Sequence, residues 1–152
     1  MHSLRLPPEF DLYFHEQLGS RVAADGNLVA VSEHAWTFLF DATPGDLVNI
    51  FQRPTFASEI DSLALLGDVA FTGSSNSGDV FAMQGPTCCL PVLSLSGDNS
   101  GFGRSLALDG RMLVIGDFGA VHVFESVVPE PNSIALGAGA MLVAFMFYRR
   151  RR

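Results

Sequence analysis

Short runs of alternating apolar and polar residues make up most of the chain, and turn-forming Gly, Asp or Pro residues separate them. Strict alternation is the period of a β-strand with one buried face. Between residues 21 and 52 the pattern predicts the four strands Arg21–Ala24, Leu28–Ser32, Trp36–Phe40 and Leu47–Gln52. The pair Asp25-Gly26 joins the first two strands and predicts a tight hairpin, because such a turn needs a positive φ.

This four-strand unit returns twice along the chain, as two sequence landmarks show. The first landmark is a glycine after an apolar run, at Gly26, Gly67 and Gly110. The second landmark is a phenylalanine, at Phe40, Phe81 and Phe124. Both landmarks are spaced by 41 and then 43 residues. Two landmarks with one common spacing indicate an internal repeat.

The second and third units predict further strands of the same kind. The second unit predicts Leu63–Leu66, Val69–Thr72, a polar loop at Gly73–Gly78, then Asp79–Met83 and Leu90–Leu95. The third unit predicts Ser105–Leu108, Met112–Gly116 and Ala120–Phe124, without a fourth strand. We therefore expect an all-β body of about eleven short strands with no helix in it.

Four antiparallel strands in each repeat are the arrangement of a β-propeller blade, so the body is predicted to be a partial β-propeller of about three blades. Propellers typically close with about four to eight blades. Three blades should form an open arc with an exposed sheet face at each end. The arc is completed by missing upstream sequence, by oligomerisation, or not at all.

The third unit carries the most informative motif of the body. It reads FGRSLALDG at residues 102–110 and LVIG at residues 113–116. This order resembles the FG-GAP repeat, the blade type of integrin α-like propellers, and the resemblance covers about residues 18–125. The first unit has Leu18-Gly19 in place of Phe-Gly and keeps Asp25-Gly26. The second unit departs, with Glu59-Ile60 in place of Phe-Gly and Leu66-Gly67 in place of Asp-Gly. Many such blades carry a calcium loop, but no loop here has D-x-D-x-D-G spacing, so we expect no calcium site.

The last part of the chain is apolar without alternation. The run Ile134–Tyr148 has no charged residue and is followed by Arg149, Arg150, Arg151 and Arg152. As a helix this run would cover about 22 Å, whereas a bilayer usually takes about 17–25 residues. Flanking polar residues and arginines can extend the span, so we predict one short transmembrane helix. The arginines favour the cytoplasmic side, which places the body outside. A buried core helix is the alternative, but such a helix should be amphipathic.

The tripeptide Pro129-Glu130-Pro131 stands just ahead of the apolar run. Pro-Glu-Pro, a short apolar helix and terminal arginines, in this order, resemble the PEP-CTERM sorting signal of Gram-negative bacteria. The resemblance implies that Pro129, Glu130 and Pro131 are recognised by an exosortase, a membrane enzyme that processes such tails. It also implies a link to extracellular polysaccharide. Two prolines hold the segment extended, which suits an enzyme's cleft. For the tripeptide alone, an ordinary linker between body and anchor is the alternative.

The charge of the body bears on its partners. The formal net charge is −7, of which the four terminal arginines and Glu130 contribute +3, so residues 1–128 carry −10 and no lysine. An acidic surface repels phosphate backbones and anionic lipid, so we expect no nucleic-acid partner. Residues 1–17 lack the apolar region of a secretory signal. Proteins of the resembled family normally carry both signals, so we expect the true start to lie upstream or the chain to be a gene fragment.

Few residues suggest chemistry. Cys88 and Cys89 are adjacent and lack metal spacing, so we interpret them as loop thiols, with a vicinal disulfide as the alternative in an exported protein. The histidines are His2, His15, His34 and His122, and none has a second ligand at metal spacing. Glu33 and Asp117 lie in comparable loops and could form a carboxylate pair, although solvated loop acids fit the pattern better. We expect no catalytic residue, cofactor or metal site.

Taken together, these observations favour an exported, non-catalytic binding or matrix module that is anchored in the membrane, or released to the cell surface or matrix after processing. One alternative is an extracellular enzyme with a site on propeller loops, and another is a truncated gene product without independent function. The expected segments are 1–17, the repeats at about 18–58, 59–101 and 102–126, the linker 127–133, the helix 134–148 and the arginines 149–152.

Overall fold

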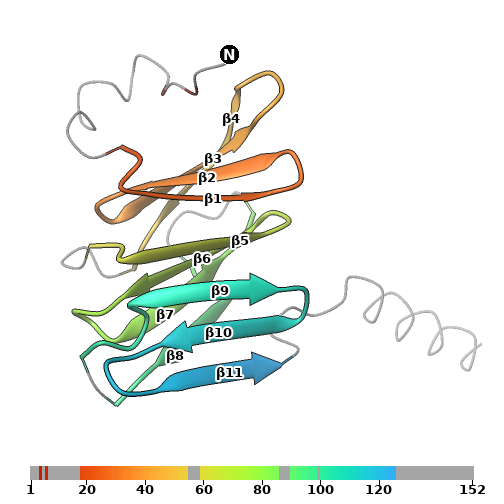
Figure 1. The fold of residues 1–152 in the computed structure, drawn as a ribbon. Coiled ribbons are helices and arrows are strands. Elements are labelled where there is room, and N and C mark those ends of the chain that lie inside the picture. Colours follow the sequence, from red (N-terminus) through yellow and green to blue (C-terminus); the bar gives the residue numbers. More distant parts are fainter. Residues whose placement is uncertain are drawn as a thin grey trace, which may run out of the picture.

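The computed structural model describes Leu4, Leu6 and the ranges 18–54, 59–85, 90–98 and 100–125. In these residues eleven strands form three antiparallel sheets that stack on one another (Figure 1). The all-β prediction is confirmed for this part of the chain, which contains no helix.

Each sheet is one of the predicted repeats, and we refer to the sheets as blades 1, 2 and 3. Blade 1 consists of β1 (Arg21–Asp25), β2 (Leu28–Glu33), β3 (Trp36–Asp41) and β4 (Leu47–Gln52). Blade 2 consists of β5 (Ser62–Leu66), β6 (Val69–Ser74), β7 (Asp79–Met83) and β8 (Leu93–Ser96). Blade 3 consists of β9 (Ser105–Asp109), β10 (Met112–Gly116) and β11 (Val121–Glu125). Within each blade, every strand pairs with the next strand along the chain.

All three blades begin with the same two-residue hairpin. Its first turn residue is a glycine, Gly26, Gly67 or Gly110, with φ angles of 57°, 55° and 55°. A positive φ at this position is typical of a type II′ turn, whose twist matches that of the paired strands. Glycine adopts this conformation without steric cost. The glycine landmark of the sequence therefore repeats because the turn geometry repeats.

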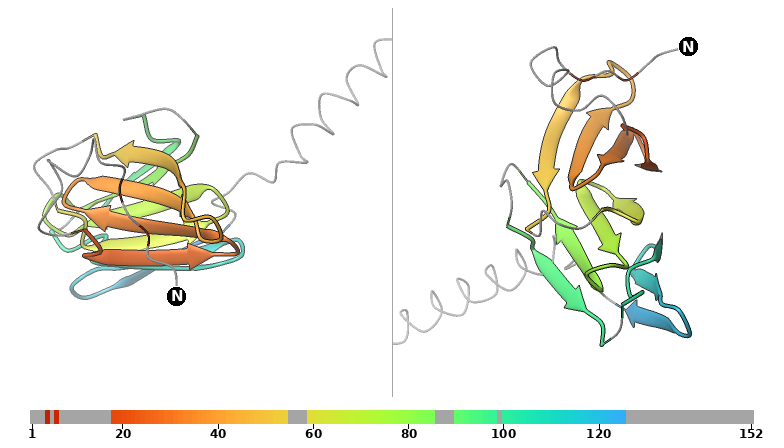
Figure 2. Two further views of the ribbon diagram at one scale, coloured as in Figure 1. Left: turned by 90° about the horizontal axis from the view of Figure 1, so that it is seen from above. Right: turned by 90° about the vertical axis from the view of Figure 1, so that its left-hand side faces the viewer.

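The blades are stacked with their first strands together. β5 lies beside β1 on one side and beside β9 on the other. Seen from the side, these first strands follow one flank of the molecule, and β4 and β8 lie on the opposite flank (Figure 2). In a β-propeller the first strand of each blade lies next to the central axis and the last strand lies at the outside, and the blades here have the same order.

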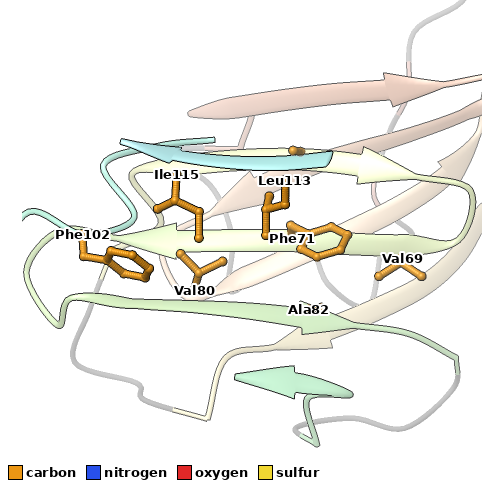
Figure 3. Close-up of a cluster of buried hydrophobic side chains, with 8 residues drawn as sticks. Val69, Phe71, Val80, Ala82, Phe102, Leu113 and Ile115 are labelled. Carbon is orange, nitrogen blue, oxygen red and sulfur yellow. The ribbon is translucent and has the colours of Figure 1, made fainter. Parts of the chain in front are cut away.

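Apolar side chains fill both spaces between blades. The buried cluster between blades 2 and 3 comprises Ala64, Val69, Phe71, Val80, Ala82, Phe102, Leu113 and Ile115 (Figure 3). The buried cluster between blades 1 and 2 comprises Ala30, Leu39, Phe51, Leu65, Ala70, Phe81 and Met83. Fully burying one such large side chain contributes roughly 1.5–3 kcal/mol. These two apolar layers therefore hold the stack together.

The face of blade 1 that points away from blade 2 is buried at its centre, so the prediction that both end faces are exposed was wrong here. Val31, Phe38 and Phe40 form its buried cluster, and Leu4 and Leu6 pack against them. The two leucines stand two positions apart, the spacing at which an extended chain presents both side chains on one side. We refer to this surface as the capped face.

The corresponding end of blade 3 is exposed, as predicted. Its outward side presents Ala107, Met112, Val114, Val121 and Val123, which alternate with inward residues along β9, β10 and β11. Val121 is 69% exposed and Val123 is 58% exposed. We refer to this surface as the open face. Two similar sheets thus end the stack in different ways.

Most strand boundaries differ from the predictions by one residue at most, but those of β6 and β8 differ by two or more. β6 continues to Ser74, because Gly73 pairs with Ser62 and Ser74 pairs with Asp79. Gly73 is a strand residue of close approach, since a Cβ atom there would overlap the carbonyl oxygen of Gly103 in the next repeat. β8 begins at Leu93 instead of the predicted position 90. Gly73 and Ser74 were therefore wrongly predicted to be loop residues, because small polar residues are common in loops, although here they belong to a strand between packed sheets.

Several predictions concern residues outside the described ranges. These are the transmembrane helix 134–148, the sorting-signal residues Pro129, Glu130, Pro131, Arg149, Arg150, Arg151 and Arg152, and also Cys88, Cys89, His2 and His15. In the part that is described, no helix combines the length and the apolar character that crossing a bilayer requires.

Candidate functional site

Polar residues gather at one end of the stack, where β2, β4, β6 and β10 end and β5, β7 and β11 begin. We call this the polar end; it includes Glu33, Arg53, Asp61, Ser74, Asp79, Asp117 and His122. Glu33, Ser74 and Asp117 are spaced by the repeat intervals of 41 and 43 residues. The repeat therefore places one polar side chain of each blade at the same end.

Arg53 is the most unusual residue of the polar end. It directly follows β4 and is 1% exposed, which makes it the largest fully buried side chain of the described residues. Its guanidinium lies 5.0 Å from the ring centre of Phe81 in blade 2. Its Nη1 and Nη2 atoms lie 3.5 Å from the carbonyl oxygens of Glu59 and Asp79. Arg53 thus links the end of blade 1 to blade 2.

The charge of Arg53 is desolvated but compensated. Burial lowers the pKa of Arg53, and the negative charges of Asp79 and Asp61 act in the opposite direction. The Nε atom has no hydrogen-bond partner in the described part of the chain. A buried arginine with incomplete hydrogen bonding costs free energy, so it needs these neighbouring carboxylates.

The two carboxylates are themselves held by hydroxyl groups. Asp61 accepts hydrogen bonds from the Ser75 backbone nitrogen at 2.7 Å and from its Oγ at 2.6 Å. Asp79 accepts one from Ser96 Oγ at 2.6 Å. These contacts fix the carboxylates in place. The arrangement therefore joins blades 1 and 2, and the buried guanidinium is not placed to meet a ligand from solution.

A second polar junction lies between blades 2 and 3. Ser62 Oγ donates a buried hydrogen bond of 2.6 Å to the carbonyl oxygen of Gly103. Nearby in blade 3, His122 Nε2 lies 3.9 Å from Asp117 Oδ2. The His122 ring also meets the edge of Phe102, with ring centres 5.3 Å apart. These groups stabilise the junction and form a small surface at its rim, because the His122 side chain is 42% exposed.

The structure separates the two acids that sequence reasoning placed in comparable loops. Glu33 is the last residue of β2 in blade 1, whereas Asp117 follows β10 in blade 3, and blade 2 lies between them (Figure 1). Glu33 is also buried, so the interpretation as a solvated loop acid was wrong for it. The two residues after β2, His34 and Ala35, form a tight turn in which His34 adopts a positive φ of 48°.

The remaining histidine of the described ranges, His34, is on the surface. Its Nδ1 lies 3.9 Å from Glu59 Oε1, and both side chains are more than half exposed. Within the described ranges, no group of three or more His, Cys, Asp or Glu residues could hold a metal ion.

Sequence reasoning missed the role of Arg53. Its position after a predicted strand and before Pro54 gave no sign of burial, since arginine is usually exposed. One signal was present: Arg53 is among only five arginines in a lysine-free body. Its burial depends on Phe81, Asp61 and Asp79, which come from the next repeat and cannot be placed by local pattern.

No protein-family model matches the chain, and no curated protein matches it. Among solved structures the chain is similar to BamB from Moraxella catarrhalis, with a TM-score of 0.53 and 22% sequence identity. BamB is a β-propeller. The fold is that of part of a β-propeller. The match covers 70% of this chain but 34% of BamB, so the chain spans about a third of that protein's length. The resemblances to FG-GAP repeats and to PEP-CTERM signals stay predictions.

Proposed function

We propose that the chain is an exported, non-catalytic, propeller-like binding or matrix module that a C-terminal PEP-CTERM-type signal sorts to the membrane. The module is anchored by the apolar run 134–148 or released after processing by an exosortase-like enzyme. The propeller-type fold supports the proposal of a propeller-like module. The order Pro-Glu-Pro, apolar run and arginines supports the proposal of a sorting signal and membrane anchor.

One observation carries the proposal: the last described strand ends a few residues before the signal in the sequence. β11 ends at Glu125, and only residues 126–128 separate it from Pro129. A processing enzyme needs its recognition segment outside the folded domain, because a peptide in a sheet cannot enter a cleft. The tripeptide follows the last strand closely enough to tether the body at the membrane surface.

Processing is tested by expressing the chain behind a cleavable export signal in a Gram-negative host that carries an exosortase. The mass of the mature protein should correspond to loss of the residues after the tripeptide. Glu130→Ala should leave the tail attached, and Glu125→Ala, which changes a nearby acid outside the tripeptide, should not. Retention of the full tail in the unchanged protein would contradict processing.

Anchoring is tested separately from processing. In a host without an exosortase, the exported protein should remain in the membrane fraction, with its body open to protease added on the outer side of that membrane. Replacing the four terminal arginines with serines should weaken this orientation, because the positive-inside signal is lost. Recovery of the unchanged protein in the soluble fraction would contradict an anchor.

The extracellular partner is proposed to be polysaccharide, by resemblance to the sorting-signal class. Binding would use exposed loops, because the spaces between blades are filled by the protein's own side chains. The measurement is co-sedimentation of the protein with the host's extracellular polysaccharide. Equal sedimentation of an unrelated acidic protein would remove support for a specific partner.

The proposal of a non-catalytic body rests on the separation of Glu33 from Asp117. The alternative, a hydrolytic enzyme, relies on the Asp117 and His122 pair at the rim of blade 3. Asp117→Asn and His122→Gln would each abolish a hydrolytic activity of that origin. A hydrolase activity on glycans that disappears in both variants would replace the proposed function with the enzymatic one.

A further inference from the structure

The two spaces between blades differ in what fills them toward the polar end. Between blades 2 and 3 the buried apolar cluster extends from Val69 to Phe102 (Figure 3). Between blades 1 and 2, buried polar side chains adjoin the apolar cluster. These are Thr37, Thr72, Ser74 and Arg53, and each of them is no more than 1% exposed.

The strand register shows that these hydroxyl groups face the space between blades 1 and 2. Thr37 of blade 1 pairs with Phe51, and Thr72 of blade 2 pairs with Phe81. Both phenylalanines belong to the cluster between these two blades. Paired residues of neighbouring strands share one face of the sheet, and so do residues two positions apart, such as Thr72 and Ser74. Hydroxyl groups of the two blades therefore point into the same space.

Four buried polar atoms at this place have no hydrogen-bond partner within the described part of the chain. They are Thr37 Oγ1, Thr72 Oγ1, Ser74 Oγ and Arg53 Nε. The Arg53 guanidinium lies over the ring of Phe81, the residue that pairs with Thr72. Buried polar groups in folded proteins are nearly always paired with protein or water atoms. Four such atoms between two facing sheets indicate a shared partner.

We propose that ordered water binds here and joins Thr37 of blade 1 to Thr72 and Ser74 of blade 2, with Arg53 Nε as a further donor. The expected spacing fits one water molecule. Stacked sheets lie about 10 Å apart, and an oxygen two covalent bonds from the backbone reaches roughly 2.5 Å toward the facing sheet. Facing hydroxyl oxygens are then about 5 Å apart, close to twice the length of a hydroxyl hydrogen bond of about 2.7–2.8 Å.

The chemistry of the four atoms favours water over an ion. A hydroxyl group both donates and accepts hydrogen bonds, as water does, whereas the Nε of arginine only donates. An anion would lie near Asp61 and Asp79, whose negative charges already act on Arg53. A cation would be repelled by the guanidinium. A buried water makes about three hydrogen bonds, so one or two molecules can satisfy the four atoms.

The test counts the bound water in the full chain, held in detergent micelles. Oxygen-17 relaxation dispersion of the solvent detects water molecules that stay bound for longer than the protein tumbles, and it does not respond to hydroxyl protons. The double variant Thr37→Val and Thr72→Val keeps the side-chain shape and should hold one or two fewer such waters. Its urea midpoint should also fall, because Ser74 Oγ and Arg53 Nε lose their partner.

Two matched variants separate loss of the hydroxyl groups from other effects. Thr37→Ser with Thr72→Ser keeps both hydroxyl groups and should keep the bound water. Ser94→Ala removes a hydroxyl from the exposed side of β8 and should change neither the water count nor the urea midpoint. If the valine variant does not fold, Ser74→Ala, which removes one of the four partners, is measured in its place against Ser94→Ala.

Two results would overturn the inference. The first is a folded valine variant, or Ser74→Ala in its place, that holds as many long-lived waters as the unchanged protein. The second is a urea midpoint that rises with chloride in the unchanged protein but not in the valine variant, since this would assign the site to an anion. Both measurements concern the folded body alone, so they do not depend on the proposed sorting or anchoring.

Discussion

The two ends of the blade stack are built from similar sheets, yet only one of them is covered. On the capped face of blade 1, Phe38 is 0% exposed under the cluster that Leu4 and Leu6 join. On the open face of blade 3, Val123 sits at a comparable place in its strand and is 58% exposed. The comparison shows that alternation makes a sheet face apolar, whereas residues far away in sequence decide whether it is buried. A blade's stability therefore depends on its neighbours as well as on its own strands.

The sharpest test of this contrast removes a side chain from each end face. Phe38→Ala should lower the free energy of unfolding by about 3–5 kcal/mol, because it leaves a cavity in a packed cluster. Val123→Ala should change the free energy by less than about 0.5 kcal/mol, as expected of an exposed position. Urea unfolding followed by circular dichroism measures both. Equal losses in the two variants would show that the end faces do not differ in burial.

Variants of Arg53 test how much the polar contacts between blades 1 and 2 contribute to stability at the capped end of the stack. Arg53→Ala should destabilise the protein by about 3 kcal/mol, because Asp61 and Asp79 lose a buried positive charge. Arg53→Met keeps the apolar contact with Phe81 and should cost less than the alanine variant. The same urea titration compares them. If methionine costs as much as alanine, the charge dominates and the packing against Phe81 contributes little.

Removing the cap should make the two ends alike. Leu4→Ser combined with Leu6→Ser should lower the free energy of unfolding by about 1–3 kcal/mol, because two partly buried leucines lose their apolar contacts. Trp36, the only tryptophan, packs at the capped face and reports on it. Its fluorescence should become more sensitive to acrylamide. The control is Val22→Ser with Val48→Ser, which changes two exposed residues and should leave the quenching unaltered.

The smallest loss expected at a buried position concerns the junction between blades 2 and 3, next to the open end. Ser62→Ala removes the buried hydrogen bond to the carbonyl oxygen of Gly103 and should cost about 1–2 kcal/mol. Hydrogen exchange should become faster in β9 and β10 but not in β2 and β3. Uniform acceleration over all blades would mean that the stack unfolds as one cooperative unit, and that its two ends cannot be compared separately.

The strands and turns could be predicted from the sequence because their determinants are local. Alternation sets the strands, and glycine at a positive φ sets the hairpins, as at Gly26. The burial of Arg53 could not be predicted, since it depends on residues that are distant in the sequence, such as Phe81. The cap formed by Leu4 and Leu6 was missed for the same reason. Gly73 was wrongly predicted to lie in a loop, because glycine is common in loops and the sequence does not show that another backbone segment approaches it closely.

Of the candidate site, only the repeat spacing of its polar residues along the chain could be predicted. The repeat interval places Glu33, Ser74 and Asp117 at one end of the blades, and the structure confirms this placement. Whether such residues meet depends on blade order, which separates Glu33 from Asp117. The contact between Asp117 and His122 arises within one hairpin, yet side-chain direction at a turn cannot be derived from alternation alone.

The pairing of each strand with its successor also has a kinetic consequence. Nearly all sheet contacts join residues that are close in the chain, so the loop-closure entropy for each hairpin is small. Each blade can form its pairs as soon as its last strand leaves the ribosome, before the next blade exists. Of the three blades, blade 3 is made last, and among the described residues its open face has no cover like that of Leu4 and Leu6 on blade 1. Its strands should be the last to gain protection during synthesis and the first to lose it when the protein is pulled or heated.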